Sequence, residues 1–224
     1  MSSSNLKPIK VWGKGGANPP KVFIILEELG IPYEIIETGF EDVKKPEYLA
    51  INPNGRIPAI KDPNNGDLVL WESGAIVEYL VERYDAARRL GFEPGSHEAQ
   101  HARQWLFFQA TGQGPYYGQA TWFSFYHPEK LPSAIDRYVR EIRRVTGVLD
   151  GWLKKQQDEG KGGADGPWLV GGKLSYADLA WVTYQKMALQ RLGPVYEEDD
   201  FPYVKDWLDR MMKREPVRKV FASL

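Results

Sequence analysis

The segment from residue 52 to residue 84 constrains the fold of this chain more than any other part. It reads NPNGRIPAI, then a turn, then LVLWESGAIVEYL. Pro58 cannot donate to a sheet ladder, so the strand predicted at 56–60 must carry it at its start or on an edge. Asn65-Gly66 is a hairpin signal, and residues 68–71 form the predicted return strand. A helix from Ser73 to Tyr84 completes a strand–hairpin–helix unit of an α/β domain.

The same segment carries groups that suit a small acidic peptide. An X–Pro bond tolerates the cis form, and a cis Ile57-Pro58 bond would turn the N–H and C=O of Ile57 outward. An extended ligand could pair with them. Ser73 is a good N-cap, and the helix N-terminus behind it attracts a carboxylate. Together with Glu72, these groups predict a receptor for a small acidic peptide.

The remaining N-terminal pattern adds two strands and a helix. Residues 9–12 and 33–36 read as strands, and between them Pro19-Pro20 opens a helix that Gly30 ends. Residues 44–50 read as a loop and a short helix. The predicted order βαβαββα matches a thioredoxin-like α/β fold in which the first two strands are parallel. We therefore expect a thioredoxin-like domain over residues 1–86.

The pattern changes character after residue 86. Residues 87–94 contain arginine, glycine and proline in a run that predicts a linker. Beyond it, apolar residues recur at helical spacing near 96–125, 131–157, 176–191 and 203–213. Ser175 and Asp178 form a capping-box signal at the start of one of these helices. We expect an all-α domain over residues 95–224.

Composition excludes several kinds of chemistry. The chain has no cysteine, which rules out disulfides, thiolate–metal sites and a cysteine nucleophile, so any reacting thiol must come from a substrate or cofactor. A net charge of −1 predicts no nucleic-acid or membrane partner. We see no membrane-spanning run and no signal peptide in residues 1–8, so we expect a cytoplasmic protein. His97, His101 and His127 form no metal-ligand set, so no metal is expected.

The motifs at Ile57-Pro58 and Glu72-Ser73 resemble the glutathione-binding half of the cytosolic glutathione transferases. The resemblance extends over residues 9–222 and implies the glutathione transferase fold, with glutathione as co-substrate. It implies that Glu72 takes the γ-glutamyl ammonium and that Ser73 takes the γ-glutamyl carboxylate. The main chain of Ile57, ahead of Pro58, would pair with the cysteinyl unit.

The resemblance also implies a partner for the glycyl carboxylate and a group that stabilises the thiolate. Lys45, or Lys44, stands where the family often places the partner of the glycyl carboxylate. Many members stabilise the thiolate with Tyr, Ser or Cys, but the loop WGKGGANPPK has none of these. Asn18 is its one neutral polar side chain, and its amide can donate to a thiolate. Lys14 is a second candidate, and Asn18 as an N-cap alone is the alternative.

Longer matches indicate a subclass. Asn18 ahead of LEELG, the segment WLFFQATGQGPYYGQA and the segment RYVREIRRVTGVLD resemble fungal glutathione transferases related to the yeast nitrogen-catabolite prion regulator. Only eight residues precede the first predicted strand, so we do not expect the Asn-rich arm of that regulator. Tyr116, Trp122 and Phe123 are candidates for the wall of an electrophile site between the domains. Ordinary helix packing is the alternative for each.

The resemblance implies a homodimer that attacks small apolar electrophiles with bound glutathione thiolate, in detoxification or secondary metabolism. Glutathione peroxidase activity would use the same site. A non-catalytic glutathione-binding regulator or scaffold on the same fold is the alternative from another class. A glutaredoxin-like thiol-transfer role is disfavoured, because the cysteine that would form the mixed disulfide is missing.

Overall fold

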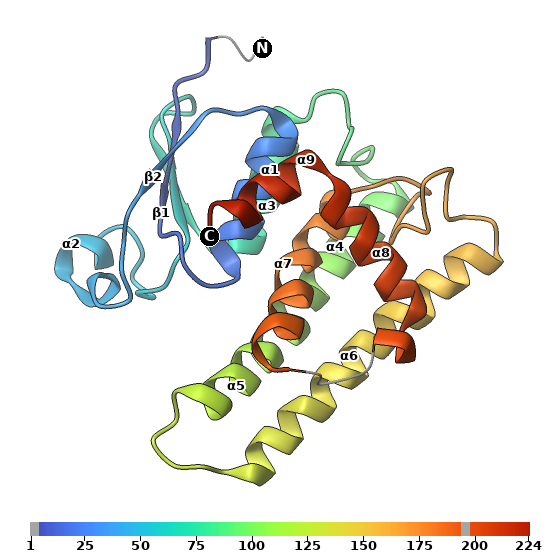
Figure 1. Cartoon of the computed structure of the whole chain (residues 1–224). Coiled ribbons are helices and arrows are strands. Elements are labelled where there is room, and N and C mark those ends of the chain that lie inside the picture. Colours follow the sequence, from blue (N-terminus) through green and yellow to red (C-terminus); the bar gives the residue numbers. More distant parts are fainter. Residues whose placement is uncertain (1–4, 194–197) are drawn as a thin grey trace. The chain divides into compact units, whose positions relative to one another are not determined.

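The computed structural model describes residues 5–193 and 198–224 and divides the chain into two compact units (Figure 1). The first unit contains Met1–Arg88 and Arg214–Leu224, and the second contains Arg89–Lys213. The first unit holds the α/β elements and the second is helical. The division differs from the expected boundaries in one respect, because the C-terminal segment belongs to the α/β unit.

The first unit is built on a four-stranded mixed sheet with strand order β2-β1-β3-β4. β1 pairs in parallel with β2, whereas β3 pairs antiparallel with β1 and β4. The strands are β1 (Ile9–Trp12), β2 (Tyr33–Ile36), β3 (Ala59–Asp62) and β4 (Leu68–Trp71). The parallel pair requires a crossover, which a helix supplies. The arrangement confirms the predicted thioredoxin-like fold.

The helices of this unit are α1 (Asn18–Leu29), the short η2 (Asp42–Lys44), α2 (Pro46–Leu49), α3 (Ser73–Tyr84) and α9 (Glu215–Ala222). The crossover helix α1 buries the run VFIIL, in which Phe23 stacks on Tyr33 of β2 with ring centroids 5.5 Å apart. Each fully buried aliphatic side chain of this kind contributes about 1.5–3 kcal/mol. Gly30 ends α1 with φ 66°. Packing of this run against the sheet holds α1 in place, and with it the start of the helix at Asn18.

Strand β3 starts later than predicted. The sequence favoured a strand from Arg56, but the ladder begins at Ala59. The carbonyl of Arg56 is taken by side chains instead, since Tyr48 Oη donates to it at 2.7 Å and Asn52 Nδ2 at 2.6 Å. Pro58 then has no N–H to donate. Pairing with the sheet can therefore begin only after Pro58.

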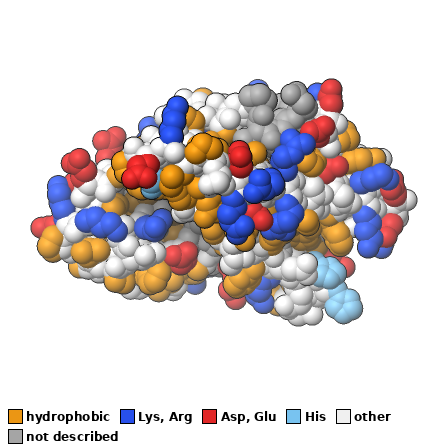
Figure 2. Space-filling view, turned by 90° about the horizontal axis from the view of Figure 1, so that it is seen from below, with side chains coloured by type: hydrophobic (Ala, Val, Ile, Leu, Met, Phe, Trp, Pro, Cys, Tyr) orange, Lys and Arg blue, Asp and Glu red, His pale blue; other side chains and the backbone are white. Residues whose placement is uncertain are grey.

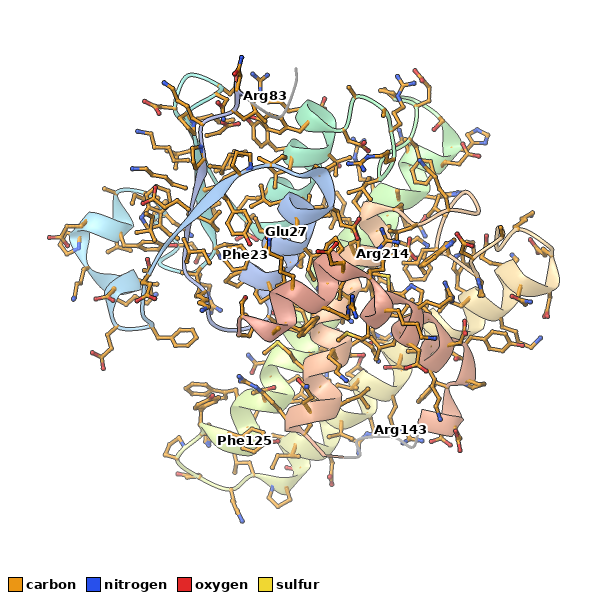
Figure 3. The ribbon with its side chains drawn as sticks, turned by 45° about the horizontal axis from the view of Figure 1, so that its top comes forward. Phe23, Glu27, Arg83, Phe125, Arg143 and Arg214 are labelled. Carbon is orange, nitrogen blue, oxygen red and sulfur yellow. The ribbon has the colours of Figure 1, made fainter. Side chains whose placement is uncertain are left out.

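The C-terminal helix α9 lies along α1, as the ribbon shows (Figure 1). Arg214, just before α9, donates from Nε and Nη2 to the two carboxylate oxygens of Glu28 at 2.7 and 2.8 Å. Lys219 pairs with Glu27 at 2.8 Å. Figure 3 shows Glu27 on α1 and Arg214 beside it. These contacts join residues far apart in sequence, so local patterns could not assign the segment to this unit.

The second unit consists of the helices predicted for it, with one interruption. Its elements are α4 (His97–Phe108), η3 (Gln109–Gln113), α5 (Gly114–Phe125), α6 (Pro132–Asp158), α7 (Tyr176–Arg191), η4 (Glu198–Asp200) and α8 (Pro202–Lys213). The predicted segment 96–125 is split by η3, a π-helical turn, which shifts the register between α4 and α5. The predicted capping box of Ser175 and Asp178 is present at the start of α7.

Candidate active site

The candidate site in the first unit lies where two helices begin. Asn18 is the first residue of α1, and Ser73 is the first residue of α3. The Ser73 hydroxyl donates to Asn18 Oδ1 at 3.3 Å, so the two helix N-termini meet through these side chains. Each N-terminus is the positive end of a helix dipole, which in α1 must act without N–H groups from Pro19 and Pro20. The junction therefore favours an anion.

Lys21 joins this contact from the first turn of α1, with only 1% of its surface exposed. Its Nζ donates to Asn18 Oδ1 at 3.2 Å and to Ser73 Oγ at 3.0 Å. The three side chains form a closed triangle of hydrogen bonds that ties α1 to α3. Burial lowers the pKa of Lys21 from 10.5 to about 7, and the negative charge of Glu72 opposes this shift. Lys21 is therefore partly protonated at neutral pH.

The sequence analysis missed Lys21. The signal was its position, because Lys21 stands three residues after Asn18 and shares its helix face. The apolar run VFIIL follows directly, which leaves a lysine at this point without an obvious route to water. The N-cap alternative for Asn18 is wrong, since Ala17 occupies the N-cap position and no side chain caps the helix. Lys14 lies half-buried in the loop before it.

The start of α3 differs from the prediction by one residue. Glu72, not Ser73, occupies the N-cap position, and Ser73 is buried as the first helical residue. Glu72 is exposed and has φ 69° and ψ 110°, a conformation that non-glycine residues rarely adopt. Such a conformation costs about 1–3 kcal/mol and is typical of ligand-binding sites. The structure thus places an exposed carboxylate next to a buried hydroxyl.

The sequence left the isomer of the Ile57–Pro58 peptide bond open, and the structure has the cis form. The side-chain hydrogen bonds to the carbonyl of Arg56 fix the residue ahead of it. Ile57 packs against the loop that follows β1, where a Cβ on Gly13 would lie 2.4 Å from Ile57 Cγ2. Gly13 also has φ 88°, which favours glycine. Ile57 is therefore held beside the loop that leads to Asn18.

The two candidate lysines for the glycyl carboxylate are both engaged in this structure. Lys45 is 61% exposed and pairs with Asp42 at 2.6 Å. Hydrogen bonding to Asp42 raises the pKa of Lys45. Lys44 Nζ donates to the carbonyl of Gly55 at 3.0 Å. Arg56 is exposed and adjoins Ile57 in the chain, so it is a cation that the sequence analysis overlooked.

The predicted electrophile-site aromatics do not form one group. Tyr116 and Phe123 of α5 both pack on Tyr138 of α6, with ring centroids 6.5 and 5.6 Å apart. Trp122 is 47% exposed and stacks instead on Tyr126, at 6.2 Å. Figure 3 shows Phe125 at the end of the same helix. Tyr116 and Phe123 thus pack between α5 and α6 while remaining half-buried, and Trp122 belongs to a more exposed aromatic cluster.

Within residues 5–193 and 198–224, no three His, Asp or Glu side chains come together in a way that could hold a metal ion. His97 and His101 lie on α4 and are exposed. No helix in those residues is long and apolar enough to cross a membrane. On the face drawn in Figure 2, acidic, basic and apolar side chains are interspersed.

Comparisons with known proteins agree with this fold. Family models of the glutathione S-transferase N-terminal and C-terminal domains match residues 18–83 and 115–215. The glutathione S-transferase-like protein gedE of Aspergillus terreus is 62% identical, over 99% of this chain and 97% of gedE. The glutathione S-transferase-like protein tpcF of Aspergillus fumigatus is 59% identical, over 98% of this chain and 97% of tpcF.

A solved structure shares the whole fold. The glutathione transferase URE2P6 of Phanerochaete chrysosporium, crystallised with oxidized glutathione, superposes with a TM-score of 0.89. It is 46% identical, and the match covers 100% of this chain and 98% of URE2P6. The chain therefore belongs to the glutathione S-transferase family, as an enzyme of its fungal, Ure2-like branch.

Proposed function

We propose that this protein binds glutathione in its first unit and conjugates the glutathione thiolate to small apolar electrophiles. The observation that carries the proposal is the contact between the starts of α1 and α3, through Asn18 and Ser73. The γ-glutamyl carboxylate and the thiolate of glutathione are two anions of one ligand. Two adjoining helix N-termini suit such a pair.

The γ-glutamyl end of glutathione is assigned to Glu72 and Ser73. The buried Ser73 offers its hydroxyl and its backbone N–H to the carboxylate, and hydrogen bonds to a charged group contribute about 1.5–3 kcal/mol. The exposed Glu72 beside it takes the ammonium. The main chain of Ile57, ahead of the cis bond to Pro58, pairs with the cysteinyl unit.

The glycyl carboxylate requires a cation beyond Ile57. Lys45 can take this role by exchanging Asp42 for the ligand carboxylate, and both side chains are exposed enough to move. Arg56 is the competing candidate, because its planar guanidinium binds a carboxylate in bidentate fashion. Single alanine variants at Lys45 and Arg56, compared by glutathione affinity, would choose between the two cations.

Asn18 is assigned to the thiolate. A free thiol has a pKa of about 8.5, and lowering it by about two units takes roughly 3 kcal/mol of selective thiolate stabilisation. The Asn18 amide donates one hydrogen bond without titrating, and the N-terminus of α1 adds its dipole. The thiol proton leaves to water. The sulfur lone pair then forms the bond to the electrophilic carbon, whose leaving group departs with its bonding pair.

We assign the electrophile site to the helical unit, with Tyr116, Trp122 and Phe123 as its candidate walls. The exposure of Trp122 and its stack with Tyr126 support a role in contacting apolar molecules. Replacing each aromatic by alanine distinguishes a residue that contacts the electrophile from a residue that only packs between helices. A wall residue raises the KM for the electrophile and leaves glutathione affinity unchanged, whereas a packing residue lowers stability first.

The test of the proposed function combines calorimetry with ultraviolet titration of bound glutathione. We expect wild-type protein to bind glutathione and to show the thiolate absorbance at neutral pH. Asn18→Ala should raise the pKa of the bound thiol and slow turnover about tenfold, since one unit of pKa is a factor of ten in thiolate. Asn5→Ala, at an exposed position, is the matched control. Wild-type protein that binds no glutathione would refute the proposal.

A peroxidase activity at the same site is the second candidate, favoured by the oxidized glutathione bound in URE2P6. The thiolate would attack a peroxide oxygen and release the alcohol. The attacked oxygen stays on the sulfur as glutathione sulfenic acid. A second glutathione thiol then attacks that sulfur, forming glutathione disulfide and releasing water, so two thiols are oxidised for each peroxide reduced. Aryl halides and organic peroxides, assayed side by side, separate the two activities. Binding without thiolate would instead favour a regulatory or scaffold role.

We also propose that the protein acts as a homodimer in the cytoplasm, as its family relationship implies. Light scattering coupled to gel filtration should give twice the chain mass of 25.6 kDa. A monomer mass at micromolar concentration would contradict the assembly. Cell fractionation with an antibody to the native chain would test the location.

A further inference from the structure

Lys21 is a buried cation in contact with both halves of the proposed glutathione site, and the reaction described above gives it no task. A protonated lysine has three N–H donors and no acceptor. Two of these donors point to Asn18 Oδ1 and Ser73 Oγ. The amide nitrogen of Asn18 is itself a donor, so it cannot face the ammonium. The Asn18 oxygen is therefore held toward Lys21, and Nδ2 is turned to the opposite side.

We propose that Lys21 is a positioning residue that holds the Asn18 amide with Nδ2 directed at the glutathione sulfur and couples this orientation to the carboxylate subsite at Ser73. The inference rests on the proposed function, in which Asn18 binds the thiolate and Ser73 binds the γ-glutamyl carboxylate. Lys21 itself touches neither the sulfur nor the electrophile.

The coupling follows from the single proton of the Ser73 hydroxyl. Without ligand, that proton is donated to Asn18 Oδ1 at 3.3 Å. A carboxylate bound at Ser73 takes the same proton, because a hydroxyl donates only once. Asn18 Oδ1 then keeps Lys21 as its donor within the triangle, at 3.2 Å. Lys21 thus matters most when glutathione is bound.

Charge acts in the same direction. A lysine ammonium buried to this degree is destabilised, and nearby negative charge restores it. Glu72 is one such charge, and a bound γ-glutamyl carboxylate adds a second beside Ser73. The ion pairs that α1 makes with the C-terminal segment lie at the other end of the helix and are neutralised by their own partners. Ligand binding therefore strengthens the donor that holds Asn18.

The test replaces Lys21 by methionine, which keeps the apolar stem and removes the donors and the charge. Because the site is buried, Lys21→Met should fold with a melting temperature equal to or above that of wild type. The pKa of the bound glutathione thiol should rise by about one unit, a tenfold loss of thiolate near neutral pH. Lys10→Met, on the exposed side of β1, removes the same charge and should leave the thiol pKa unchanged.

A double-mutant cycle makes the test specific to Asn18. Asn18→Ala should raise the pKa of the bound thiol when Lys21 is present. In the Lys21→Met background, Asn18→Ala should change the thiolate fraction by less than about twofold. S-methylglutathione has no thiol. Lys21→Met should weaken its binding by a smaller factor than the factor by which Lys21→Met lowers the thiolate fraction of bound glutathione. If Lys21→Met does not fold, Lys21→Leu takes its place and is read in the same way, because it also removes the charge and the donors.

The outcomes separate this inference from the proposed function. Wild-type protein without bound thiolate would overturn the proposed function itself. If wild-type protein binds the thiolate, Asn18→Ala raises the pKa of the bound thiol and Lys21→Met leaves that pKa unchanged, the positioning role alone is overturned. Additive effects of the two substitutions would also overturn it, because Lys21 would then act on the thiolate without Asn18.

Discussion

The starts of helices α1 and α7 each bury an ionisable side chain, but they do so in opposite ways. At α7, Asp178 accepts hydrogen bonds from the backbone N–H groups of Ser175 and Leu169 and from Trp207 Nε1. A carboxylate in a first helical turn also suits the helix dipole. At α1, the buried group is Lys21, a cation, which the same dipole disfavours.

The difference teaches how to recognise a functional group among buried charges. The partners of Asp178 are structural, since two are backbone amides, one is the buried capping hydroxyl of Ser175 and one is a buried tryptophan. Two partners of Lys21, Asn18 and Ser73, are polar side chains of the candidate site, and Asn18 is only half-buried. A natural sequence departs from local rules mainly where function requires it. The start of α1 is such a departure.

The largest expected effect tests the structural side of the comparison. Asp178→Ala leaves four buried donors without this acceptor, and each costs about 1–3 kcal/mol. We expect the free energy of unfolding to fall by about 3 kcal/mol or more, measured by urea denaturation. Asp136→Ala, on the exposed surface of α6, should change it little. A loss below about 1 kcal/mol for Asp178→Ala would remove the contrast between the two helix starts.

The second prediction concerns the pH dependence of stability at α1. The pKa of Lys21 is about 7 in the folded chain and near 10.5 when unfolded. Between these values the unfolded chain holds a proton that the folded chain has lost, so stability rises with pH, by at most about 1.4 kcal/mol per pH unit. Below pH 7 both states hold the proton and the contribution is flat.

Comparison with Lys21→Met isolates this contribution. The stability advantage of Lys21→Met over wild type should be largest below pH 7 and should shrink as the pH rises toward 10.5. Urea denaturation of both proteins at a series of pH values measures it, with Lys10→Met as the control that shows no such trend. An advantage that does not change with pH would mean that Lys21 titrates normally in the folded protein.

The third prediction concerns Ser73, which joins the two helix starts. Ser73→Ala removes an acceptor for Lys21 and the donor proposed for the γ-glutamyl carboxylate. We expect glutathione to bind about tenfold more weakly, by calorimetry, because a hydrogen bond to a charged group contributes about 1.5–3 kcal/mol. Ser133→Ala, at the exposed start of α6, is the control. Unaltered affinity would move the γ-glutamyl subsite away from Ser73.

Local sequence patterns were enough to predict the strands and most of the helices, because each depends on residues close in the chain, but they left the isomer of the Ile57–Pro58 bond open. The triangle of Asn18, Lys21 and Ser73 could not be predicted in the same way. It joins the starts of two helices that are more than fifty residues apart, and Lys21 looks like an ordinary lysine until its burial is known. The placement of α9 depends on equally distant ion pairs. Glu72 at the N-cap required the backbone conformation itself.

The smallest expected effect concerns Lys45, which differs from Lys21 in being exposed. The Lys45 ammonium already pairs with Asp42, so binding a glycyl carboxylate exchanges one solvated ion pair for another. We expect Lys45→Ala to weaken glutathione binding about fivefold at most, with the effect reduced further by added salt. Arg56→Ala should have the larger effect if the guanidinium holds the carboxylate. If Lys45→Ala lowers glutathione affinity as much as Ser73→Ala does, an exposed cation binds this ligand as firmly as a buried hydroxyl. Burial would then no longer rank the contributions of the residues in the site.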